Sequence, residues 1–155
     1  MDKKSISECD ADADRAIKTM IAGMGVAGVI PAVINIGVAM GAMGVGAVSI
    51  GNAYGVALNK EQGGKLVKEF IKSAGLTFLG INVGTQIVSA ILQATGIGYF
   101  LGAALNGAVA AATGWAVGSC AKEYFRREYL GQNKPSKEEL GELFRRTFRE
   151  KKNNK

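Results

Sequence analysis

The sequence predicts an all-α protein made of two hydrophobic helical hairpins, rich in glycine and alanine, followed by a C-terminal amphipathic helix. Three observations lead to this prediction. First, the 19 basic and 13 acidic residues all fall in residues 1–18, 60–72 and 122–155. Second, the stretches 19–59 and 73–121 hold no charged side chain and are long enough for helices that cross a membrane. Third, the polar tail repeats its apolar residues with the period of a helix.

The two uncharged stretches predict contact with lipid. A helix of a water-soluble domain normally carries charges on its exposed face. A domain of this size buries only about 70% of its surface, so neither stretch fits entirely inside a core. We therefore expect a membrane-embedded protein. The alternative is a soluble helical oligomer that hides its apolar faces between copies.

Three segments follow from this pattern. Residues 1–18 form a polar N-terminal segment, whose acids we expect to cap a helix that starts near residue 11. Residues 19–130 form the hydrophobic helical-hairpin domain. Within it, Pro31 is expected to start a helix over 31–57, and the alternative is a pair of helices that turns at Gly41–Gly46. The second hairpin is expected to turn near residues 93–98. The part at 19–30 is too short to cross a bilayer, so its depth stays open. Residues 131–155 form a basic amphipathic helix and tail.

Glycine is frequent in the uncharged stretches, although it is a poor helix former in water. In lipid the backbone keeps its hydrogen bonds, and small residues let two helices approach closely. Pairs of glycines four residues apart predict tight helix packing, within the chain or between copies. These pairs are Gly37 and Gly41, Gly51 and Gly55, Gly80 and Gly84, Gly98 and Gly102, and Gly114 and Gly118.

Polar residues gather on one face of the helix expected over 73–93. Asn82, Gln86, Ser89 and Gln93 are spaced so that they share that face. The structural interpretation is hydrogen bonding between helices inside the membrane. The alternative function is a homo-oligomeric pore lined by these side chains.

The basic residues predict an orientation. If each uncharged stretch is a hairpin, the N-terminus, the 59–72 loop and the C-terminal helix lie on one side. The loop and the tail are net positive, so the positive-inside rule makes that side cytoplasmic. We expect no secretory signal peptide, because the first eighteen residues are polar and carry five acids.

The tail, residues 131–155, is predicted to form a separate helix. Gly131 is expected to close the preceding helix, and Ser136 with Glu139 forms a capping box. The helix can dock on the protein itself, lie on an anionic membrane surface or bind a partner. Its apolar stripe and flanking arginines are Leu140, Leu143, Phe144, Arg145, Arg146, Phe148 and Arg149.

Chemistry-bearing residues are few. The chain has no histidine and two distant cysteines, Cys9 and Cys120, so we expect no enzyme, no cofactor and no metal site. The acids of "CDADAD" at 9–14 match the first ligands of an EF-hand, but Arg15 and Ile21 replace the required glycine and glutamate. Nucleic acid is not expected as a partner, because the basic residues of the tail alternate with acids.

Several short motifs resemble a known family. They are Ile30-Pro31, Tyr54-Gly55-Val56, Asn59-Lys60-Glu61, Gly96-Ile97-Gly98, Asn106 and Lys122-Glu123-Tyr124-Phe125. Together they resemble the YcjF-type GTPase-associated domain, a family of bacterial hydrophobic helical domains often found downstream of Era-like small GTPase domains. Ala32-Val33 stand where that family usually shows a second proline and an acid. The resemblance implies an all-helical, membrane-associated module, and the chain itself has no P-loop motif.

These observations lead to one expected function. We expect a membrane-embedded helical scaffold or adaptor that contacts lipid and associates with further copies of itself. The resemblance adds a separately encoded small GTPase as a partner.

Overall fold

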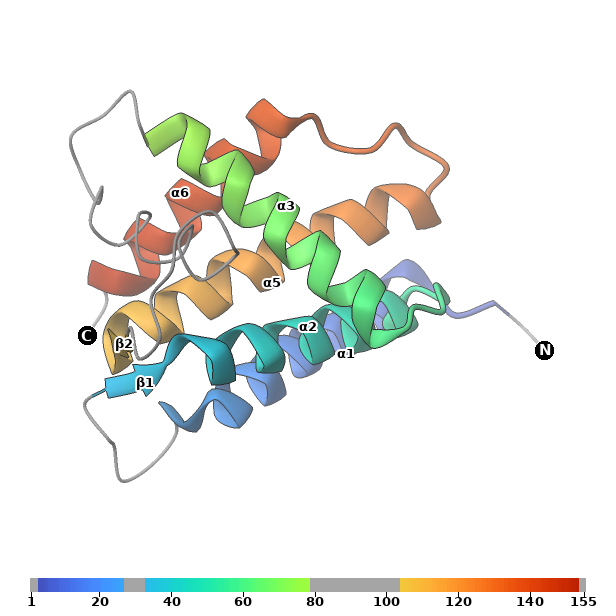
Figure 1. Ribbon diagram of the computed structural model, residues 1–155. Coiled ribbons are helices and arrows are strands. Elements are labelled where there is room, and N and C mark those ends of the chain that lie inside the picture. Colours follow the sequence, from blue (N-terminus) through green and yellow to red (C-terminus); the bar gives the residue numbers. More distant parts are fainter. Residues whose placement is uncertain (1–2, 27–32, 79–103, 154–155) are drawn as a thin grey trace.

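The computed structural model describes residues 3–26, 33–78 and 104–153, which form a bundle of helices (Figure 1). The α-helices are α1 (Ile6–Ile21), α2 (Ile36–Ala53), α3 (Lys60–Phe78), α5 (Gly107–Tyr129) and α6 (Lys137–Asn153). A π-helical turn, η1 (Ala22–Val26), extends α1, and β1 (Val33–Asn35) pairs with β2 (Ala104–Asn106). The all-α prediction is confirmed, because within the described ranges the only strands are these two three-residue segments.

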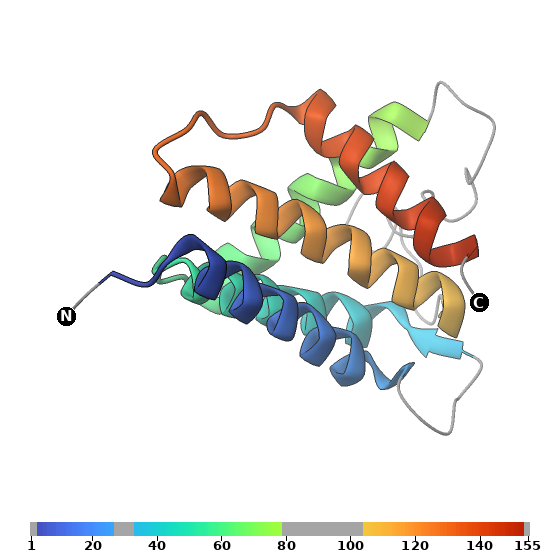
Figure 2. The same ribbon diagram turned by 180° about the vertical axis from the view of Figure 1, so that it is seen from behind.

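Helix α5 is the centre of the bundle. It packs against α1, α2, α3 and α6, and both views show it between α1 and α6 (Figures 1 and 2). Helix α3 crosses the bundle and contacts both α2 and α6. The buried side chains of all five helices therefore form one core.

The bundle has two different ends. At the strand end, which is on the left in Figure 1, lie β1, β2, the last turns of α3 and α6, and the points where the described chain stops after residues 26 and 78. At the loop end lie the N-terminus and the connections over 54–59 and 130–136 (Figures 1 and 2). The uncharged residues 79–103 therefore leave and re-enter the described structure at the strand end.

The two short strands bring the first turns of α2 and α5 together. They are antiparallel, with Val33 opposite Asn106 and Asn35 opposite Ala104. Each strand runs directly into its helix, so α2 and α5 start side by side at the strand end.

Helix α1 begins earlier than the sequence analysis expects. Ser5 is its N-cap, and Ser5 and Glu8 form a reciprocal capping box. The prediction that the acids of 10–14 cap a helix from residue 11 is therefore wrong, since they lie in the middle of α1. Cys9, Ala13 and Ile17 recur every four residues and are buried, which makes this charged segment part of the core.

The charged segment over 60–72 is a helix. The sequence analysis treats 59–72 as a loop, and this prediction is wrong because α3 covers Lys60–Phe78. Asn59 and Gln62 exchange hydrogen bonds at its start. Val67, Phe70 and Ile71 are buried while the lysines stay exposed, so the segment is an amphipathic helix.

A first hairpin is present, but its first arm is α1, in the polar segment, and not the stretch 19–30 that the sequence predicts. Helices α1 and α2 are antiparallel neighbours, but α2 starts at Ile36 and ends at Ala53, not at the expected 31 and 57. Gly55 follows at φ 78°, a conformation that glycine adopts without strain. The second predicted hairpin falls largely on residues 79–103 and lies outside the described residues.

The C-terminal helix docks on the bundle. Gly131 has φ 69° and follows the end of α5, as expected. Ser136 and Glu139 form the predicted capping box, with the Ser136 backbone N–H 2.7 Å from the Glu139 carboxylate. Leu140, Phe144 and Phe148 are at most 6% exposed and pack against α5 and α3.

Among the described residues, no helix has both the length and the apolar character needed to span a bilayer.

Candidate functional surfaces

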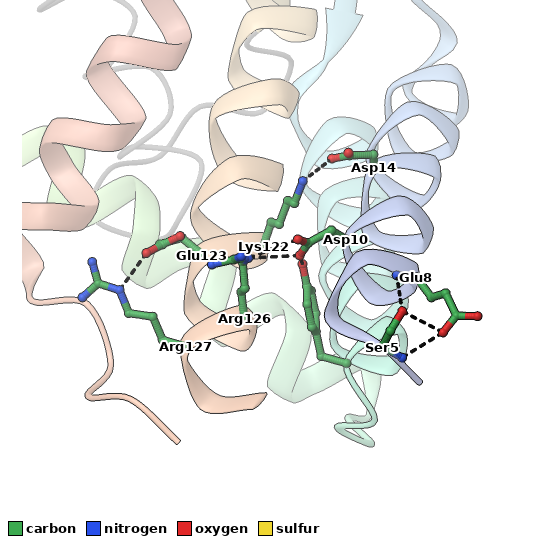
Figure 3. A network of polar contacts seen from close by, with 9 residues as sticks. Ser5, Glu8, Asp10, Asp14, Lys122, Glu123, Arg126 and Arg127 are labelled. Atoms are coloured by element: carbon green, nitrogen blue, oxygen red, sulfur yellow. Dashed lines mark hydrogen bonds and ion pairs between the residues drawn. The ribbon is translucent and has the colours of Figure 1, made fainter. Parts of the chain in front are cut away.

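Two pairs of opposite charges join α1 to α5. Asp10 and Asp14 are one turn apart on α1, and Lys122 and Arg126 are one turn apart on α5. The helices are antiparallel, so Asp14 lies 2.7 Å from Lys122 Nζ and Asp10 lies 3.2 Å from Arg126 Nε (Figure 3). These charges match in register across the two helices.

Asp10 is the centre of this polar network. The Tyr54 hydroxyl, at the end of α2, donates to Asp10 Oδ1 at 2.6 Å, and Arg126 Nε donates to both carboxylate oxygens. Burial disfavours the ionised carboxyl, but the hydrogen bonds from Tyr54 and Arg126 outweigh it and hold the pKa of Asp10 below its ordinary value. Burial and the same hydrogen bond raise the pKa of Tyr54. The network thus ties three helices together at the loop end.

Further ion pairs lie near this end. Arg127 contacts Glu123 at 2.7 Å and Glu139 at 3.1 Å, which joins α5 to the first turn of α6. Asp12 pairs with Lys4 and Arg15. The acids of 10–14 therefore point to separate cations, and the described residues contain no group of side chains suited to hold a metal ion. These ion pairs therefore hold neighbouring segments of the bundle together.

Replacing Asp10 by asparagine is expected to destabilise the fold by about 1 kcal/mol at neutral pH, because a charge-assisted hydrogen bond is lost. The folded pKa of Asp10 lies below the ordinary 3.8, so its stabilisation is present above that pH and is lost as the pH falls through the folded pKa. Wild type and Asp10→Asn should therefore converge in acid.

Urea unfolding of both proteins over a pH series measures this difference. Asp14→Asn is the matched control, because Asp14 is 53% exposed and its pair with Lys122 contributes little. A constant difference between wild type and Asp10→Asn at every pH would contradict the prediction.

The predicted helix-packing glycines have different surroundings. A Cβ on Gly118 would lie 2.7 Å from Ile17 Cγ1, and one on Gly114 would lie 3.0 Å from Met24 Sδ, so this pair lets α1 approach α5. Gly51 makes room for the Phe125 ring. Gly55 lies beyond the end of α2, so Gly51 and Gly55 are not a helical pair, which corrects that prediction.

An open groove of about 700 Å³ runs between α1 and α2. Its lining is mostly apolar, and Val45 in it is 49% exposed. The lining side chains recur at helical spacing on both helices. They include Ala16 and Thr19 on α1, Gly23 on η1, and Gly41, Val45 and Ser49 on α2. Small residues make up much of this surface, the Asp12–Arg15 ion pair also lines it, and another helix can pack on it.

The tail arginines surround the buried stripe of α6. Arg146 lines a groove of about 310 Å³ with Glu139 and Glu142. Arg149 is exposed, and Lys151 Nζ lies 4.2 Å from the centre of the Trp115 ring on α5. The apolar residues Phe144 and Phe148 contact the protein's own core, so in this conformation they are not available to lipid. Of the three uses that the sequence leaves open for this helix, docking on the protein itself is the one that this conformation shows.

Both cysteines are buried and free. Cys120 Sγ lies 3.5 Å from the Leu140 carbonyl oxygen, between α5 and α6. Burial raises the pKa of the Cys120 thiol, which suppresses the reactive thiolate. Cys120 is therefore a packing residue in this fold.

Several predicted residues lie outside the described residues. They are the polar face Asn82, Gln86, Ser89 and Gln93, and the glycines Gly80, Gly84, Gly98 and Gly102. Gly37 lies in α2, in a part where only the backbone is described.

Sequence analysis missed the Asp10 network and the contact of α2 with α3 at Gly44 and Gly63. A signal for the first was present. Acids one turn apart near the N-terminus and bases one turn apart at 122 and 126 are complementary on antiparallel helices. No local pattern predicts the contact of α2 with α3, because glycines in a charged segment are also typical of a turn.

Comparison with known proteins adds one match. A family model described as "Domain of unknown function (DUF697)" matches residues 47–153, which include α3, α5 and α6. No curated protein and no solved structure matches the chain.

Proposed function

The chain belongs to the family described as domain of unknown function DUF697, and from its bundle we propose that it is a membrane-associated helical scaffold or adaptor that self-associates. The observation that carries the proposal is the difference between the two ends of the bundle. Ion pairs join α1, α5 and α6 near the loop end, and uncharged stretches leave from the strand end.

The uncharged residues support contact with lipid. Residues 79–103 are 25 consecutive residues without a charged side chain, and residues 27–32 also carry none. A bilayer is crossed by about 20 apolar residues of helix. Because both stretches join the bundle at its strand end, this end is the one that faces the membrane in our proposal.

The groove between α1 and α2 supports self-association. Val45 is one of the exposed large hydrophobic residues, and it lies between Gly41 and Ser49 on one face of α2. Small residues at this spacing let a second helix approach closely, in membranes above all. A second copy of the chain is the proposed occupant of this groove.

A separate small GTPase is the proposed protein partner. The support is the resemblance of residues 30–125 to the YcjF-type GTPase-associated domain. The described surface offers the exposed charged faces of α3 and α6 to such a partner.

One experiment tests both parts of the proposal. Membranes from cells that produce the full chain are washed with alkaline carbonate and then treated with a cross-linker. We expect the protein to stay in the membrane pellet and to give cross-linked oligomers. Val45→Glu should remain in the pellet but lose the cross-linked species, since it places a charge in the groove.

Leu130→Glu is the matched control, because Leu130 is 41% exposed but lies at the loop end, away from the groove. It should behave as wild type. Release of the wild-type chain by carbonate as an intact oligomer would overturn the membrane proposal in favour of a soluble helical oligomer.

A further inference from the structure

We propose that the strand end carries a rim of cations, Lys72, Arg149 and Lys151, that binds the headgroups of anionic phospholipids. The inference rests on the proposed membrane function and adds the lipid class and the residues that recognise it.

The three cations belong to the last turns of α3 and α6. Lys72 lies six residues before the end of α3, and Arg149 and Lys151 lie four and two residues before the end of α6. A helix rises about 1.5 Å per residue, so all three lie within about 10 Å of their helix ends. Both helix ends are at the strand end (Figures 1 and 2).

Both ends of the bundle carry cations, and acids pair with only some of them. At the loop end, Arg126 and Arg127 are bound by acids, and Lys65 pairs with Glu61. At the strand end, Lys72 and Arg149 are exposed and form no ion pair with any residue that the structure describes. The last five residues of α6 hold three basic side chains and one acid. This end therefore has unneutralised positive charge.

Trp115 places an aromatic ring beside this charge. The Lys151 ammonium lies over the indole ring at 4.2 Å, and Trp115 is partly exposed. Tryptophan and lysine side chains favour the layer between water and hydrocarbon. The pair thus suits a position at headgroup level.

The position of the uncharged stretches favours lipid over other anionic molecules as the partner of these cations. Residues 27–32 and 79–103 leave from the end that carries the rim. Cations next to chain that enters hydrocarbon meet lipid phosphates and carboxylates at the surface. Each such cation strengthens binding to an anionic surface about fivefold.

Flotation of the full chain with vesicles tests the rim. One set of vesicles is phosphatidylcholine, and the other contains phosphatidylserine in addition. We expect wild type to prefer the anionic vesicles, and added salt should weaken that preference. Lys72→Gln, Arg149→Gln and Lys151→Gln combined should lower partition onto anionic vesicles on the order of a hundredfold. Flotation with neutral vesicles should not change.

The control removes the same charge at the loop end, through Lys60→Gln, Lys65→Gln and Lys134→Gln, and should retain the preference of wild type. Equal losses in the two triple variants would overturn the rim, because total charge would then explain binding. Equal binding of wild type to both vesicles would overturn the rim but leave the proposed function intact. Absence of wild type from both floated fractions would overturn both proposals. Circular dichroism checks that each variant is folded.

Discussion

Replacing Phe125 by alanine is expected to lower the free energy of unfolding by about 4 kcal/mol. Phe125 is 1% exposed and lies on the central helix α5. Its ring meets Tyr124 edge-on at 5.3 Å, and its Cζ lies 3.3 Å from the position of a Cβ on Gly51. Truncation removes these contacts and leaves a cavity where α5 meets the end of α2.

Denaturant unfolding followed by circular dichroism measures this loss. Leu130→Ala is the control, since Leu130 is 41% exposed and should change stability by no more than about 0.5 kcal/mol. If both substitutions had the same small effect, the packing of α5 on α2 would be incorrect.

Two neighbouring glycines in α3 should respond in opposite directions to alanine. A Cβ on Gly63 would lie 2.5 Å from the Gly44 carbonyl oxygen and 2.8 Å from Val48 Cγ2, so Gly63→Ala forces α3 away from α2. Overpacking of this kind costs about 1–3 kcal/mol. A Cβ on Gly64 meets nothing within 4 Å, so Gly64→Ala should stabilise α3 by up to about 1 kcal/mol.

Gly63→Ala and Gly64→Ala make the same change at adjacent positions of α3, so both gain the same helix propensity. A difference in stability between them therefore reports the contact with α2. Melting temperature and urea midpoint should fall for Gly63→Ala and rise for Gly64→Ala. Stabilisation by both would show that α3 does not pack closely on Gly44. Destabilisation by both would show that alanine disfavours this helix for a reason other than the contact.

For α6, the local sequence pattern predicts where the helix forms but not what its apolar face packs against. Its start at the capping box and its apolar stripe are set by residues close in sequence, and the helix appears where these predict it. The pattern does not decide whether the apolar stripe of α6 packs on the protein itself, on an anionic membrane surface or on a partner. Packing of α6 against α3 and α5, with Cys120 beside the Leu140 carbonyl, decides which surface the stripe meets, and such contacts involve residues distant in sequence.

The charged segments show the opposite outcome. The polar character of 1–18 and 60–72 suggests segments outside the hydrophobic bundle, yet α1 and α3 each bury one face in it. The buried residues, such as Ile17 and Phe70, are separated by charged residues that dominate the composition. Helical period, not average polarity, carries the packing information here.

Residues close in sequence were enough to predict the all-helical fold, the end of α5, the start of α6, and the separation of charged from uncharged stretches. These depend on residues a few positions apart, through capping, glycine conformation and composition. Tertiary packing alone brings Asp10 to Arg126 and Gly63 to Gly44. These depend on the shapes and charges of side chains that only folding brings together.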